Sequence, residues 1–142
     1  MIKNYIDDNK INPSLPILLC PSFAKPNFDY RHFEGKIINK TNIKEFLVKF
    51  LFFYLLNTGN YVLNKKIIDN LKYDASILEM ISACDVLYFN LQCFQQFDSL
   101  QLHIVPNLEY THIVHAGSIY LETEKKCAYF RDAYVTPEYY KL

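Results

Sequence analysis

Two histidines that lie close together would carry the most specific chemistry in this chain. His112 and His115 are three residues apart, and a hydrolase or nuclease would use one histidine as base and another as acid. Lys125 and Arg131 would supply the cation that holds a phosphate. The β-forming neighbours predict a strand, in which an odd spacing sends the two rings to opposite faces. The two histidines are therefore weak catalytic candidates, and we expect them not to share a metal ion.

The sequence carries no motif for a cofactor or a metal. Its three glycines are too few and too scattered for a Gly-rich phosphate loop. Its four cysteines include no Cys-x-x-Cys pair, and each lies among apolar residues, as is typical of buried free thiols. We therefore expect neither a cofactor nor a bound metal.

Charges of opposite sign collect in the two halves of the chain. Overall, 15 Lys and Arg balance 15 Asp and Glu, so no net charge attracts the chain to nucleic acid or to anionic lipid. Residues 1–71 hold ten basic and six acidic residues, whereas residues 72–142 hold five basic and nine acidic ones. The acidic second half predicts a basic protein partner.

Tyrosines accompany the acidic residues of the second half. Tyr120 and Tyr129 each alternate with apolar neighbours in predicted strands, so they should lie on the opposite side of those strands. Tyrosine supplies a large contact area at a small cost in side-chain entropy. The alternative is that the tyrosines line the core of the sheet and the acids form its solvated rim. We predict a partner-binding surface made of Tyr120, Glu122, Glu124, Tyr129 and Asp132.

Helices are predicted in the middle of the chain, ahead of these candidate residues. Apolar residues at three- and four-residue steps predict helices over residues 41–56 and 62–71. A third helix begins at Ser76, which forms a capping box with Glu79. Its apolar seam runs on to about Phe97.

Strands are predicted after the helices. From Leu100 the apolar residues alternate with a period of two, until Pro106 and Asn107 predict a turn. Three further strands are expected over residues 110–116, 118–123 and 127–133. This order indicates an α+β fold, with about three helices packed on one face of a C-terminal antiparallel β-meander.

The beginning of the chain is rich in proline. Four of the six prolines fall within the first 26 residues, so we expect residues 1–35 to form an irregular segment packed on the rest. Within it, the four apolar residues 17–20 predict a short strand or a buried strap. The length of 142 residues and a 51% hydrophobic composition predict one α+β domain over residues 1–142 and exclude intrinsic disorder.

Three functions are compatible with these features. The absence of an apolar leader at the start of the chain predicts a cytoplasmic protein. Together with the acidic, tyrosine-rich half, this favours a non-enzymatic inhibitor of the immunity or antitoxin type, which blocks a basic toxin such as a nuclease. An accessory protein of a virus or mobile element that binds a host factor is a second possibility, suggested by the richness in Asn, Ile, Lys and Tyr. A small hydrolase or nuclease that uses His112 or His115 is the third.

Overall fold

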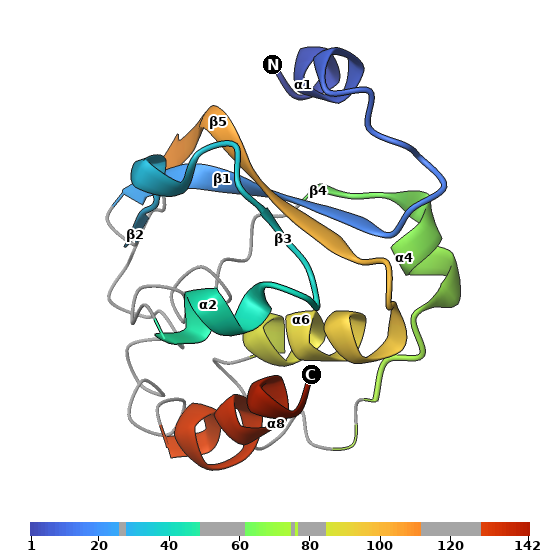
Figure 1. The fold of residues 1–142 in the computed structure, drawn as a ribbon, viewed down its shortest axis with the longest axis vertical. Coiled ribbons are helices and arrows are strands. Elements are labelled where there is room, and N and C mark those ends of the chain that lie inside the picture. The colour runs from blue at the N-terminus through green and yellow to red at the C-terminus, as the bar shows by residue number, and fades with distance from the viewer. Residues whose placement is uncertain (26–27, 49–61, 75, 77–84, 112–128) are drawn as a thin grey trace.

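The chain folds into a mixed α and β structure, seen in a computed structural model that describes all residues except 26–27, 49–61, 75, 77–84 and 112–128 (Figure 1). The helical elements are α1 (Ile2–Asp8), η1 (Arg31–Phe33), α2 (Ile43–Val48), α4 (Lys65–Asn70), α6 (Asp85–Gln96), η2 (Arg131–Val135) and α8 (Thr136–Lys141). The strands are β1 (Ile17–Lys25), β2 (Phe28–Asp29), β3 (Ile37–Ile38), β4 (Val62–Leu63) and β5 (Gln101–Thr111). Among the described residues, no helix is long and apolar enough to cross a membrane.

The centre of the sheet is a parallel pair formed by β1 and β5. The strands β2 and β4 pair with β1, and β3 pairs with β5, all three in antiparallel fashion. The expected purely antiparallel, C-terminal sheet is therefore wrong: the sheet is mixed, and one central strand comes from the proline-rich segment. Residues 112–116 and 118–123 of the predicted strands lie outside the described residues. The expected strand over residues 17–20 is confirmed and runs on to Lys25. A run that is apolar on both faces suits a central strand, because both of its faces are buried.

An irregularity in β5 replaces the predicted turn at Pro106 and Asn107. Val105 pairs with Pro21 and Glu109 pairs with Phe23, so β5 has two more residues than β1 over this stretch. Asn107 takes the left-handed conformation, with φ of 56°, which asparagine tolerates better than most residues. Because Pro21 has no N–H to donate, it is best tolerated where the pairing of the strands is interrupted. The chain therefore bulges at these residues and continues as a strand.

The two faces of the sheet are covered by different helices. Leu18, Cys20, Leu102 and Ile104 belong to the larger core cluster, which also contains buried residues of α2, α4, α6 and the C-terminal helix. The opposite face carries Ile17, Leu19 and Val105, and these pack against Ile2, Tyr5 and Ile6 of α1. Figure 1 shows α1 on one side of the sheet and α2, α6 and α8 on the other. The expectation that all helices pack on one face is therefore wrong for α1, a helix that was not predicted from the sequence.

The predicted helices correspond in part to the observed ones. Helix α2 begins at Ile43 within the predicted range 41–56 and is described as far as Val48, and the rest of that range lies outside the described residues. The prediction over 62–71 is wrong at its start, because Val62 and Leu63 pair with β1 as the strand β4. Helix α6 confirms the later part of the third predicted helix, while Glu79 of its capping box lies outside the described residues.

One side chain joins the segment before β1 to the start of α4. The Asn64 amide nitrogen donates to the carbonyl oxygens of Pro13, at 3.2 Å, and Leu15, and its amide oxygen accepts from the Ile17 N–H at 3.3 Å. Asparagine suits this role because its side chain both donates and accepts hydrogen bonds. Asn64 therefore fixes the entry of the chain into the central strand.

Candidate protein-binding surface

The predicted functional residues divide into those that the structure describes and those that it does not. Tyr129 and Asp132 of the predicted partner-binding surface lie in a helical segment at the C-terminal end of the chain. The remaining members of that surface and both candidate catalytic histidines lie outside the described residues: Tyr120, Glu122, Glu124, His112 and His115. The candidate site is therefore built from the C-terminal segment, residues 129–141.

This segment is helical, which corrects the predicted strand 127–133 over residues 129–133; residues 127 and 128 lie outside the described residues. Residues 129 and 130 are helical, residues 131–135 form the π-helical turn η2, and α8 continues to Lys141. Pro137 lies at the start of α8. Inside a continuous helix a proline lacks its N–H and its ring crowds the carbonyl four residues earlier, so a widened turn before it accommodates the ring.

The π-helical turn also explains which residues are buried. Phe130, Val135 and Tyr139 are buried, at successive spacings of five and four residues. A spacing of five does not fall on one face of a regular α-helix, but it does across one turn with i→i+5 hydrogen bonds. Because the spacing is mixed, the buried residues do not form the three- and four-residue repeat that indicates an α-helix. The alternation of apolar residues over 127–131 resembled a strand instead.

Tyr139 anchors the segment to α6. Its side chain is fully buried, its hydroxyl donates to the Leu87 carbonyl oxygen at 3.2 Å, and its ring meets that of Phe94 edge to face at 6.3 Å. Figure 1 shows α6 between the sheet and α8. The inner face of the C-terminal segment is therefore held by core contacts, which fixes the direction of its outer face.

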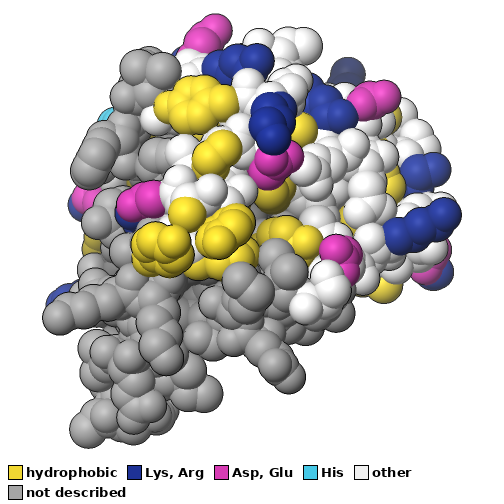
Figure 2. All heavy atoms as spheres, turned by 90° about the horizontal axis from the view of Figure 1, so that it is seen from below, with side chains coloured by type: hydrophobic (Ala, Val, Ile, Leu, Met, Phe, Trp, Pro, Cys, Tyr) yellow, Lys and Arg dark blue, Asp and Glu magenta, His cyan; other side chains and the backbone are white. Residues whose placement is uncertain are grey.

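Three tyrosines of the segment are exposed to solvent. Tyr129, Tyr134 and Tyr140 are 69%, 51% and 48% exposed. The rings of Tyr129 and Tyr134 lie 6.4 Å apart in an edge-to-face arrangement, and Tyr134 stacks on Phe130 at 5.3 Å. Figure 2 shows hydrophobic side chains gathered on the molecular face that is seen from below. Tyr134 was absent from the predicted surface, because its place beside Tyr129 depends on the helix.

The charges of the segment are balanced. Arg131 bonds the Asp132 carboxylate at 2.7 Å, and Lys141 forms an ion pair with Glu138. Both pairs are at least partly exposed, and such pairs contribute little to stability. The outer face of the segment therefore offers aromatic contact area rather than a net negative charge.

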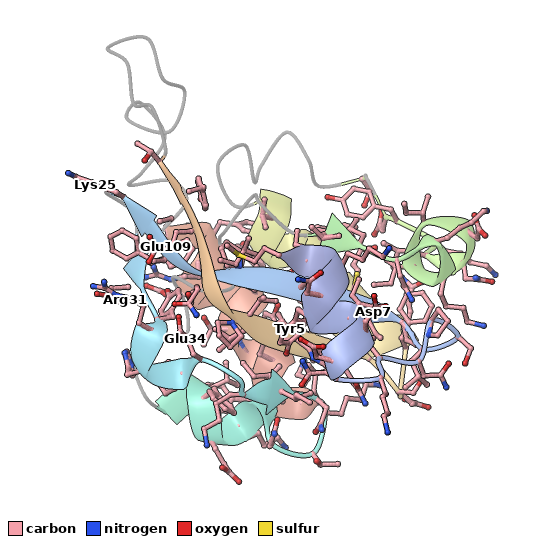
Figure 3. All side chains as sticks on the ribbon, turned by 90° about the horizontal axis from the view of Figure 1, so that it is seen from above. Tyr5, Asp7, Lys25, Arg31, Glu34 and Glu109 are labelled. Carbon is pink, nitrogen blue, oxygen red and sulfur yellow. The ribbon has the colours of Figure 1, made fainter. Side chains whose placement is uncertain are left out.

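A second charged cluster lies at the far end of β1 and β5. The Arg31 guanidinium bonds the Asp29 carboxylate and lies 4.6 Å from the centre of the Phe23 ring. Its hydrogen bond lowers the pKa of Asp29 to about 2. The Glu34 carboxylate accepts from the Asn107 N–H at 2.9 Å, which lowers the pKa of Glu34. Figure 3 shows Arg31, Glu34 and Glu109 at the same end of the sheet. These groups serve the fold by pairing with each other and by closing the bulge of β5.

His103 is the one buried histidine among the described residues. Its Nδ1 lies 3.2 Å from the Tyr5 hydroxyl, and its Nε2 lies 3.1 Å from the Gln101 amide oxygen. Burial lowers the pKa of His103, and the side chain is only 3% exposed. A substrate would have to displace α1 to reach this ring, so His103 is not a catalytic residue in this arrangement.

The residues that the structure describes offer no site for a metal ion and no reactive thiol. No group of three or more His, Cys, Asp or Glu side chains among these residues is arranged to hold a metal ion. Cys20 and Cys93 are buried, and burial raises the pKa of the Cys93 thiol to about 12. A reactive thiol needs an exposed thiolate, so neither cysteine is a candidate nucleophile.

Comparisons of the chain with models of known protein families, with curated proteins and with solved structures found no match.

Proposed function

We propose that this protein is a non-enzymatic inhibitor of the immunity or antitoxin type, which binds a basic partner such as a nuclease toxin through its C-terminal segment. The observation that carries the proposal is the pair of exposed tyrosines, Tyr129 and Tyr134, on a helical segment whose buried residues anchor it in the core. Tyrosine is enriched at the centres of protein interfaces, where a few aromatic anchors supply most of the binding energy.

The anchoring of the segment supports a binding role. An interface side chain that is already fixed in the free protein loses less conformational entropy when the complex forms. Tyr134 is held by stacking on Phe130, and Tyr129 is held by its edge-to-face contact with Tyr134. These two rings therefore form a preorganised pair, to which a partner binds without first having to order them.

The basic character of the partner rests on the sequence rather than on the segment itself. The charges within residues 129–141 balance, whereas residues 72–142 together carry four more acidic than basic residues. An acidic surface accelerates association with a basic protein, and the effect weakens as salt increases. The tyrosines would then slow dissociation, because most differences in affinity arise in the dissociation rate.

The test is affinity capture of the tagged protein from its own cell lysate at low and moderate salt, followed by mass spectrometry. The proposal requires one stoichiometric basic protein, whose activity the purified chain blocks at a ratio of one to one. The double substitution Tyr129→Ala and Tyr134→Ala should weaken binding by about thirty-fold or more, as expected for two aromatic anchors.

A matched control is available on another helix. Ile68 on α4 is 67% exposed and lies outside the proposed surface, so Ile68→Ala removes exposed apolar area without removing the proposed anchors. The control should bind as the unchanged protein does. Equal affinity of the tyrosine variant, or the lack of a basic partner at both salt concentrations, would refute the proposal.

A further inference from the structure

A row of four side chains crosses four strands on the sheet face that α1 covers. The register pairs Ile37 with His103, His103 with Leu19, and Leu19 with Val62. The two central members, His103 and Leu19, are each 3% exposed, whereas Ile37 and Val62 at the ends are 41% and 39% exposed. Helix α1 therefore covers the middle of a largely apolar row and leaves both of its ends open to solvent.

Helix α1 has little helical stability of its own. It has seven residues and no side chain that caps its first turn, and isolated helices of this length are unstable in water. Asp7 and Asp8 end the helix, where negative charge opposes the helix dipole. Its place on the sheet therefore depends on the packing of Ile2, Tyr5 and Ile6 and on the hydrogen bond from Tyr5 to His103.

In the neutral ring, the contacts of His103 place its proton on Nε2. The Gln101 amide oxygen accepts only, so Nε2 must donate to it across the 3.1 Å contact. Nδ1 then carries the lone pair and accepts a hydrogen bond from the Tyr5 hydroxyl oxygen, which lies 3.2 Å away. A second proton would go to Nδ1, and the Tyr5 hydroxyl would then have to turn and accept a hydrogen bond instead of donating one.

The groups that contact the ring are uncharged, so none of them offsets the desolvation of a charged imidazole by an ion pair. Tyr5 is the titratable side chain of α1 that contacts the ring, and its ring lies edge to face with the imidazole at 6.1 Å. The neighbours in the register, Leu19 on β1 and Ile37 on β3, are apolar, and β5 supplies the neutral Gln101. The charged residues nearby in sequence are exposed: Lys3, Asp7 and Asp8 of α1 and Lys36 before β3. Burial is accordingly the cause that lowers the pKa of His103.

We propose that α1 is a pH-sensitive latch, held closed by the Tyr5 and His103 contact and released when His103 is protonated. Release hydrates the imidazolium and uncovers the row from Ile37 to Val62. Figure 3 shows Tyr5 on α1 above the two central strands. The sheet can remain intact on release, because the larger core lies on its other face.

The direction of the pH effect follows from the number of protons that the open and closed states bind. The open state, with a solvated histidine, binds a proton near the ordinary pKa of about 6.5, whereas the closed state binds it only at lower pH. Closure is therefore most favourable above pH 7 and becomes less favourable as the pH falls below about 6.5. Between pH 7.5 and pH 5.0 the opening equilibrium rises by up to roughly thirty-fold, the limit for a ring that stays neutral while closed.

Hydrogen exchange of individual amides tests the latch in the unmodified chain. The reporters in α1 and just after it are the amides of Tyr5, Asn9 and Ile11, which donate within this segment. Their protection, corrected for intrinsic exchange rates, should fall by about ten- to thirty-fold from pH 7.5 to pH 5.0. The Ile104 amide, which donates to Lys36, should keep its protection. Loss of protection at all four amides together, or at none, would overturn the proposal.

Two histidine variants separate the latch from other effects of acid. His103→Gln removes the titration and keeps a polar side chain for Tyr5, so protection of α1 should no longer depend on pH. His32→Gln removes an exposed histidine on η1, so the pH dependence should remain.

The ¹⁵N chemical shifts of His103 in the unmodified protein provide a test that needs no variant. They should report the Nε2–H tautomer and a pKa below 6.5. A pKa at or above this value, or an unchanged pH response in His103→Gln, would contradict the latch.

Discussion

The docking of the C-terminal segment on α6 leads to a quantitative prediction at Tyr139. Tyr139→Phe keeps the ring and removes the hydroxyl that donates to the Leu87 carbonyl oxygen at 3.2 Å. That carbonyl lies within α6 and keeps its place in the helical hydrogen-bond ladder, so no buried acceptor is left without a partner. The expected loss is about 1 kcal/mol of unfolding free energy, typical of one buried hydrogen bond.

Tyr139→Ala should cost considerably more. This substitution also removes a fully buried ring and its contact with Phe94, and large-to-alanine changes in a core cost roughly 3–5 kcal/mol. Tyr140 provides the matched control, because its side chain is 48% exposed. Tyr140→Phe should leave the stability unchanged within about 0.5 kcal/mol.

Urea unfolding followed by far-ultraviolet circular dichroism measures these differences. With a slope of about 2 kcal/mol per molar urea, the midpoint should fall by about 0.5 M for Tyr139→Phe and by roughly 1.5–2.5 M for Tyr139→Ala. A Tyr139→Ala variant as stable as Tyr140→Phe would refute the reasoning, because it would mean that the buried face of the segment does not hold it on α6. The orientation proposed for Tyr129 and Tyr134 would then lose its basis.

Three further predictions concern other contacts. Asn64→Ala should lower the free energy of unfolding, measured in urea, by about 1–3 kcal/mol, since it leaves backbone groups before β1 without partners. Asn70→Ala on the exposed side of α4 should have little effect. Equal effects of the two substitutions would contradict the role of Asn64 in holding the segment before β1. The Asp29 carboxyl should titrate near pH 2 by NMR, and its contribution to stability should persist above about pH 4 and disappear as the pH falls toward 2. The substitution Arg31→Gln should return the pKa of Asp29 toward 3.8. An unchanged pKa in this variant would rule out Arg31 as the cause. The Cys93 thiol should resist alkylation in the folded protein at pH 8 and react in urea, as read by mass spectrometry, and rapid labelling of the folded protein would show that it is accessible.

Local patterns in the sequence identified several elements correctly. The apolar run over residues 17–20, the alternation that begins at Leu100 and the seam of α6 are each decided by neighbouring residues, so periodicity alone predicts β1, the start of β5 and α6. The α+β class follows from the same patterns. The exposure of Tyr129 was also expected, although from a strand register that the structure replaces with a helix.

Contacts between distant residues decided the rest. Residues 17–25 and 101–111 become parallel neighbours although most of the chain lies between them, and no local pattern specifies which distant strand a segment joins. The two-residue strands β3 and β4 exist because β5 and β1 offer them hydrogen bonds, and their length is too short for a periodic signal. In the C-terminal segment, burial of Phe130, Val135 and Tyr139 against the core outweighs the strand preference of residues 127–133.

The sequence by itself thus determined the kind of elements and the supply of tyrosines and acids, because those depend on composition and on neighbours. Only the tertiary structure decided that Tyr129 and Tyr134 lie together on the surface and that His103 lies beneath Tyr5, 98 residues away along the chain. Such placements depend on which surfaces bury one another when the whole chain packs, and each is a property of a pair of elements rather than of either one alone.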